Sequence, residues 1–220
     1  MKRTQEARIR KTNRFFKNQE AAIMDIQYEL RGMARKIRNA KGYTKLAVRL
    51  NCFSDLKWEE MVYDCLGGKN IFQANPDIQF YDYTKYPYTH RPAWDGMDLN
   101  YHLTYSYDGT VNDFENVEEV LDKGKNVKVI LSKEVWKEII KELGRWDNGG
   151  SFHTTAKEVL SDTFSKLKFD HNRFFLGGLW KYLMTEYTLY NGESHDNRFL
   201  DPSPVILLGV EKGQSHIKLV

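Results

Sequence analysis

Five short apolar runs recur along this chain, and they constrain its fold more than any other feature. Uninterrupted apolar runs of this length are typical of strands buried on both faces, as in a parallel sheet flanked by helices. The predicted strands are 47–51, 78–83, 101–106, 127–132 and 205–210. We therefore predict an α/β fold, either a partial (β/α) barrel or an open parallel sheet of about five strands with a helical insertion.

Helical patterns fill the intervals between these runs. Over 4–40, apolar residues recur at steps of three and four, which predicts one long helix or two. Further helices are predicted at 56–66, 69–74 and 115–122, with Ser54 or Asp55 capping the first of these. The predicted organisation is a single domain, with a basic helical segment at 1–45, βα repeats at 46–132, a helical insertion at 133–189, and a polar loop and last strand at 190–220.

Several classes of protein are excluded by what the sequence lacks. It has no run of 18 apolar residues, which predicts no transmembrane helix and no membrane partner. The basic N-terminus lacks the apolar core of a secretory signal. Two cysteines, Cys52 and Cys65, are too few for a disulfide framework or a metal site, so we assign no metal ligands and expect a reducing, cytoplasmic compartment.

Charge is distributed unevenly along the chain. Residues 1–50 hold fourteen Lys and Arg against four Asp and Glu, a local net charge of +10, whereas residues 51–220 hold nineteen against twenty-six, a net of −7. This asymmetry favours an anionic partner for the N-terminal part, most commonly nucleic acid, and the alternative is a solvated surface helix. The predicted backbone contacts are Arg8, Arg10, Lys11, Arg14 and Lys17.

The loop at 84–99 interleaves aromatic residues with basic ones, including Arg91. Such a composition suits stacking on unpaired bases, and it suits equally a lid packed over the end of a barrel.

Polar residues follow the first strands, where parallel α/β folds place their ligands. Asp55, Asp82 and Lys85 are candidate catalytic residues there, and Lys85 would hold an anionic ligand. A buried Asp82 would need a partner such as Arg49 or Lys85. The loop before the last strand adds His195, Asp196 and Asp201, which could serve as acid and base or bind a divalent metal, or could simply shape the turn.

Five segments carry a resemblance to an uncharacterised family of bacteriophages and mobile elements related to the gene-product-88 group. They are VRLNCFSDLKWEE (48–60), NIFQANPDIQFYDYTK (70–85), NYHLTYS (100–106), VKVIL (127–131) and ESHDNRFLDPSPVILLG (193–209). The resemblance implies a partial (β/α) barrel similar to radical S-adenosylmethionine enzymes and a location in the host cytoplasm. Members of the family carry a Cys-rich stretch ahead of the first long helix. This sequence begins where that stretch ends, so either its natural start lies upstream or the cluster has been lost.

Three functions follow as hypotheses. The first is a phage-type protein that contacts nucleic acid through its basic N-terminal helix. The second is a metal-dependent or degenerate radical-type enzyme acting on nucleotides, with a cofactor that the sequence leaves unknown. The third is a non-catalytic factor that binds a host protein complex, such as an inhibitor of host defence.

Overall fold

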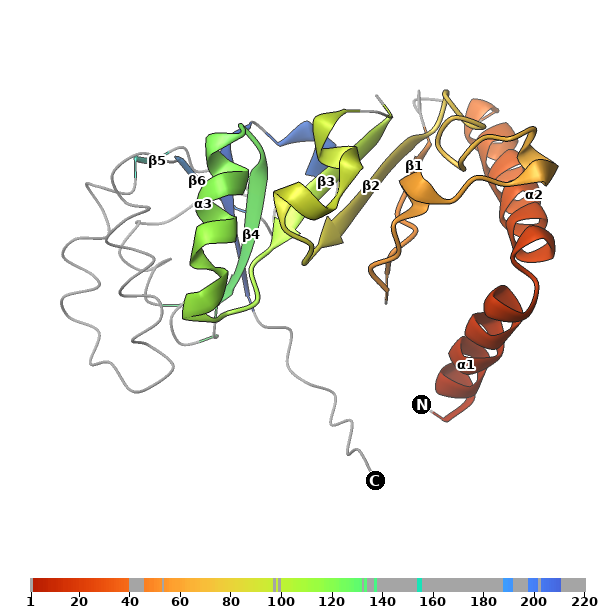
Figure 1. The fold of residues 1–220 in the computed structure, drawn as a ribbon, viewed down its shortest axis with the longest axis horizontal. Helices are drawn as coiled ribbons and strands as arrows, with labels where there is room; N and C mark the ends of the chain where they lie inside the picture. The colour runs from red at the N-terminus through yellow and green to blue at the C-terminus, as the bar shows by residue number, and fades with distance from the viewer. Residues whose placement is uncertain are drawn as a thin grey trace. The chain divides into compact units, whose positions relative to one another are not determined.

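A computed structural model describes residues 2–39, 46–52, 54–96, 98, 100–131, 133, 137, 154–155, 188–191, 198–201 and 203–210 (Figure 1). The chain divides into two compact units. The first unit comprises Met1–Asp82 and Arg91–His102, and the second comprises Tyr83–His90 and Leu103–Val220. No helix among the described residues is long and apolar enough to cross a bilayer.

The N-terminal segment forms two helices, α1 (Lys2–Lys17) and α2 (Gln19–Arg38), as one of the two predicted arrangements had it. They meet at Asn18, whose extended backbone (φ −153°) interrupts the helix. The Asn18 side chain accepts a hydrogen bond from the Ala21 N–H at 3.0 Å, so this residue is the N-cap of α2.

Helix α2 packs through one face and is held in place by polar contacts at that face. Ala22, Ile23 and Leu30 are buried there. The amides of Gln27 and Asn75 are also buried and exchange two hydrogen bonds of 2.9 and 2.8 Å. This reciprocal pair satisfies four polar groups at once, and it joins α2 to the turn that precedes β2.

The helix predicted over 56–66 is wrong. Two short 3₁₀ turns, η1 (Trp58–Glu60) and η2 (Asp64–Leu66), stand in its place, with extended backbone at Met61 and Tyr63 between them. The side chains of Trp58 and Glu59 are buried and bonded to residues outside this segment, Asn51 and Arg91, and those contacts outweigh the local helical pattern.

Three smaller features of the first half of the chain also add to or differ from the prediction. The first strand, β1 (Ala47–Val48), is shorter than predicted, and turns replace the short helix at 69–74. The loop at 84–99 contains two 3₁₀ turns, η3 (Tyr88–His90) and η4 (Pro92–Asp95).

The remaining strands follow the prediction closely. They are β2 (Gln79–Thr84), β3 (Tyr101–Ser106), β4 (Asn126–Leu131) and β7 (Val205–Val210), and the helix between β3 and β4 is α3 (Phe114–Asp122). In the first unit β1 pairs in parallel with β2. In the second unit the order is β3-β4-β7-β6-β5, with every pair parallel except β5 and β6. The fold class is therefore an open α/β arrangement, without a closed barrel among the described strands.

Two strands of the second unit fall where a helical insertion was predicted. These are β5 (Thr154–Thr155) and β6 (Thr188–Asn191), and β6 continues the parallel sheet beside β7. Most of the predicted insertion at 133–189 lies outside the described residues.

The two faces of the sheet in the second unit differ in chemistry. Figure 1 shows α3 alongside β4, and Val117, Val120 and Leu121 of α3 are fully buried. Tyr105 of β3 lies on this helix-covered face, because its hydroxyl donates to Asp113 at the start of α3. Side chains alternate along a strand, so Thr104 lies on the opposite face.

Candidate functional site

Arg91 forms ion pairs with two acidic side chains of the first unit, Asp55 and Glu59. Its guanidinium is fully buried. Its Nε donates to Glu59 Oε1 at 2.8 Å, and one terminal nitrogen donates to Asp55 Oδ1 at 2.5 Å. The other terminal nitrogen donates to the Leu56 carbonyl and the Tyr101 hydroxyl, both at 2.9 Å. All three guanidinium nitrogens are therefore engaged inside the unit.

Asp82 lies at the far end of the same network. Its carboxylate is inaccessible to solvent and accepts hydrogen bonds from the Asn51 N–H at 2.8 Å and the Tyr101 hydroxyl at 3.2 Å. The predicted partner Arg49 is present, with its Nε 3.8 Å from Asp82 Oδ1. Burial raises the pKa of Asp82 to about 7, although both donors and Arg49 act to lower it.

Tyr101 joins the two halves of this network, because its hydroxyl accepts from Arg91 and donates to Asp82. Burial, together with the Asp82 carboxylate, holds the pKa of Tyr101 well above its ordinary value. The phenol is therefore a neutral hydrogen-bond relay between a guanidinium and a carboxylate.

Asn51 shapes the loop that carries these acids. Its Oδ1 accepts from the Ser54 hydroxyl, the Leu56 N–H and the Trp58 indole N–H at 2.8, 3.1 and 3.0 Å. Its Nδ2 donates to the Leu56 carbonyl at 2.8 Å. One side chain thus fixes a tight loop, and that loop presents Asp55 to Arg91 rather than capping a helix.

Of the acids in this network, Asp55 is the one that reaches solvent. Its side chain is 28% exposed, whereas those of Glu59 and Asp82 are 1% and 0% exposed. No cluster of three His, Cys, Asp or Glu suited to a metal occurs among the described residues. The arrangement suits a buried ionic core that fixes the loops around it. Sequence analysis missed Glu59 and Tyr101 because their roles depend on contacts distant in sequence.

The other predicted catalytic residues lie elsewhere. In the second unit, Lys85 Nζ is 3.4 Å from the Ser106 carbonyl oxygen at the end of β3. Asp201 is buried just before β7. His195 and Asp196 lie outside the described residues.

The predicted nucleic-acid contacts separate into two environments. Those on α1 are exposed, whereas Arg91 is buried in the ionic core and presents no accessible donor. On α1, Arg10, Arg14 and Lys17 are four and three residues apart and share one face, with Lys11 beside it. Arg14 also pairs with Asp25 of α2 on the surface.

An aromatic contact also joins helix α1 to the rest of the first unit. Phe15 is buried and meets Trp58 edge to face, with 5.4 Å between ring centroids. Ile9 and Phe16, seven residues apart on another face, are 52% and 62% exposed. The helix therefore presents both a basic face and an apolar one.

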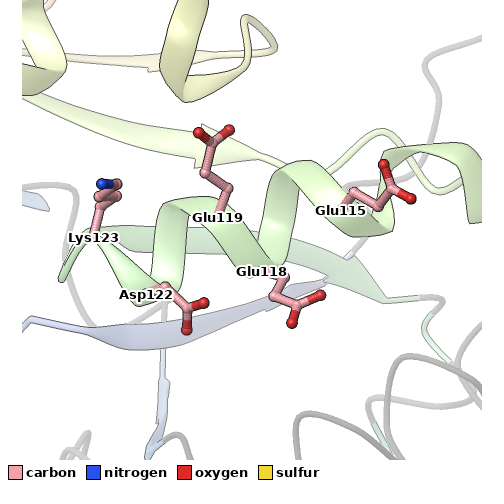
Figure 2. Close-up of a pocket in the computed structure, with 5 residues that line it drawn as sticks. All are labelled: Glu115, Glu118, Glu119, Asp122 and Lys123. Carbon is pink, nitrogen blue, oxygen red and sulfur yellow. The ribbon is translucent and has the colours of Figure 1, made fainter.

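The surface of α3 is acidic and borders an open hollow of about 410 Å³. Figure 2 shows Glu119 projecting from the opposite side of the helix to Glu118 and Asp122. The carboxylates diverge, so they do not converge on a single cation. Residues Glu115, Glu118, Glu119, Asp122 and Lys123 line the hollow.

Comparison with known proteins gives one match. A family model described as Gene product 88 covers residues 1–218, essentially the whole chain, and confirms the predicted relationship to that group. Neither the curated proteins nor the solved structures contain a match. The chain therefore belongs to the gene product 88 family.

Proposed function

We propose that this protein binds the phosphate backbone of nucleic acid through α1. The observation that carries the proposal is the composition and exposure of that helix. Its sixteen residues contain seven Lys and Arg and a single acid, Glu6. The five predicted contacts, Arg8, Arg10, Lys11, Arg14 and Lys17, are all exposed.

The dimensions of the helix suit this partner. From Arg10 to Lys17 the helix rises roughly 10 Å, and double-stranded DNA carries a charge about every 1.7 Å along its axis. A helix lying against the backbone would therefore meet several phosphates. The Arg14–Asp25 pair is no obstacle, since an exposed ion pair of this kind contributes only about 0–1 kcal/mol.

Fluorescence anisotropy with labelled single- and double-stranded DNA and RNA tests the proposal. Reversing Arg8, Arg10 and Lys11 to Glu is expected to weaken binding about 100-fold or more, because each phosphate contact is lost and replaced by repulsion. The matched control reverses three exposed residues of α2, Arg31, Arg35 and Lys36. Equal weakening by both variants, or no binding at low salt, would refute the assignment to α1.

A protein partner is the second candidate, because the same helices expose large apolar side chains. Met24 and Tyr28 of α2 are 60% and 81% exposed, in addition to Ile9 and Phe16 of α1. Large exposed apolar side chains on these helices favour a protein interface, such as one with a host complex. Replacing Phe16 and Tyr28 by Ser would abolish such an interface and leave phosphate binding by α1 largely intact.

A kinship with radical S-adenosylmethionine enzymes is a further hypothesis from the sequence resemblance, and the cysteines of this chain do not fit it. A cluster with an open site needs three thiolates, and the sequence contains Cys52 and Cys65. Both are free and exposed, thirteen positions apart. We therefore derive no chemistry through such a cluster.

A further inference from the structure

The sheet face opposite α3 in the second unit is polar where a buried face is usually apolar. Register pairs Thr104 of β3 with Asn126 of β4, and Ser106 with Lys128. Paired residues of adjacent parallel strands share a face, so these four side chains lie together on the face opposite Tyr105. Thr104 and Asn126 are 0% exposed and Lys128 is 6% exposed.

Two of these buried groups have no hydrogen-bond partner in the part of the chain that the structure describes. They are the Thr104 hydroxyl and the Asn126 amide nitrogen. The other end of the Asn126 amide is fixed, because its Oδ1 accepts from the Val205 N–H at 3.2 Å. An unsatisfied buried polar group costs about 1–3 kcal/mol, and two side by side on one face point to a ligand that completes them.

The carboxyl end of the same strands adds positive charge. Lys128 stands beside Ser106 in register, and the Lys85 ammonium is 3.4 Å from the Ser106 carbonyl oxygen. Two lysines therefore flank one serine at the strand ends, where ligands of parallel α/β folds bind. Ile130, two residues beyond Lys128 on the same face, is 52% exposed, so this end of the face is open to solvent.

We propose that this face binds a small oxyanion, a phosphate or carboxylate group carried on a polar molecule. Lys85, Ser106 and Lys128 bind the anionic end at the strand termini. Thr104 and Asn126 bind the polar body deeper on the sheet, where the hydroxyl and the amide nitrogen supply one donor each. The site is independent of α1 and adds a small-molecule ligand to the proposed function.

Calorimetric titration of the full chain tests the site, with pyrophosphate as the phosphate probe and citrate as the carboxylate probe at matched ionic strength. We expect one of the two to bind. Thr104→Val and Lys85→Gln should each weaken that binding about tenfold, the effect of losing one polar contact. The control Lys69→Gln, on an exposed lysine of the first unit, should leave binding unchanged.

Thermal unfolding supplies a second readout that does not depend on ligand. Without ligand, Thr104→Val should melt at or above the temperature of the unmodified protein, because the substitution removes an unsatisfied buried hydroxyl without changing its volume much. A lower melting temperature, no binding of either probe, or equal binding by Lys85→Gln and Lys69→Gln would overturn the proposal. Loss of oxyanion binding would leave nucleic-acid binding by α1 unaffected.

Discussion

Replacing Arg91 by Met is expected to lower the free energy of unfolding by about 3–5 kcal/mol, the usual effect of removing one partner of a buried ion pair. The contacts of Arg91 place the expected loss at the upper end of this range. The Glu59 carboxylate, 1% exposed, would lose both bonds to Arg91 at 2.8 and 3.3 Å. The Leu56 carbonyl and the Tyr101 hydroxyl would each lose a donor. Domains of this kind are stable by about 5–15 kcal/mol, so the loss is a large fraction of the total.

Urea denaturation followed by circular dichroism measures this loss. With a slope of about 2 kcal/mol per molar urea, the midpoint should fall by roughly 2 M. Arg35→Met, which removes an exposed arginine of α2, is the matched control and should change stability by less than about 0.5 kcal/mol. If Arg91→Met does not fold, Arg91→Lys retains the charge but cannot reproduce the bonds to Glu59, Asp55 and Leu56, and should still destabilise the protein.

A double-mutant cycle measures the interaction energy between Arg91 and Glu59 apart from their other contacts. Glu59→Gln should cost about 1–3 kcal/mol alone. The double variant should cost less than the sum of the two single changes, by about 1–3 kcal/mol. A cost below about 1 kcal/mol for Arg91→Met, or strict additivity with Glu59→Gln, would refute the view that this ionic core holds the first unit together.

Three further predictions concern the first unit. Burial raises the pKa of Asp82 from 3.8 to about 7, so the folded state binds the carboxyl proton of Asp82 more tightly than the unfolded state does. This proton contributes up to about 4 kcal/mol to the free energy of unfolding below pH 4, and the contribution is lost as the pH rises through 7. Asp82→Asn should flatten this part of the profile of unfolding free energy against pH, and parallel profiles for the two proteins would contradict it. Gln27→Leu leaves the buried Asn75 amide without its partner and should cost about 1–3 kcal/mol in urea denaturation, whereas an unchanged midpoint would show that the amide pair contributes nothing. Gly67→Ala should cost about 1 kcal/mol through its positive φ of 69° alone, since an added Cβ meets no atom within 4 Å, and a loss above about 3 kcal/mol would mean that packing is disturbed.

The strands of the fold could be predicted because their signal is local. The run at 205–210 is continuous and apolar, the run at 101–106 is rich in aromatic and β-branched residues, and both strands have the predicted bounds. Helix α3 ends before Gly124, where a positive φ of 71° favours glycine, as its sequence pattern indicates. Asn18 shows the same local logic at the start of α2, although its capping role emerged only in the structure.

The contacts of Arg91 in the ionic core could not be predicted because the residues that they join are distant in sequence, whereas Arg49 was predicted as a partner of a buried Asp82. The segment 56–66 has a helical pattern, but Arg91 bonds Glu59 across 32 positions, and Asn51 bonds Trp58 from the neighbouring loop. Arg91 itself resembled a surface cation in an aromatic loop. Only the tertiary contacts distinguish a buried guanidinium from an exposed one, and the spacing of residues in the sequence does not predict these contacts.

The salt dependence of nucleic-acid binding tests the role of α1 most directly. Log affinity falls linearly with log salt, with a slope of about −0.9 per phosphate contact on double-stranded DNA. Replacing the exposed α1 residues Arg8, Arg10, Lys11 and Lys17 by Gln should make the slope shallower by about 3–4. The α2 control, with Gln at Arg31, Arg35, Lys36 and Arg38, removes the same charge and should keep the original slope. Equal slopes for the two variants would contradict a contact made by α1.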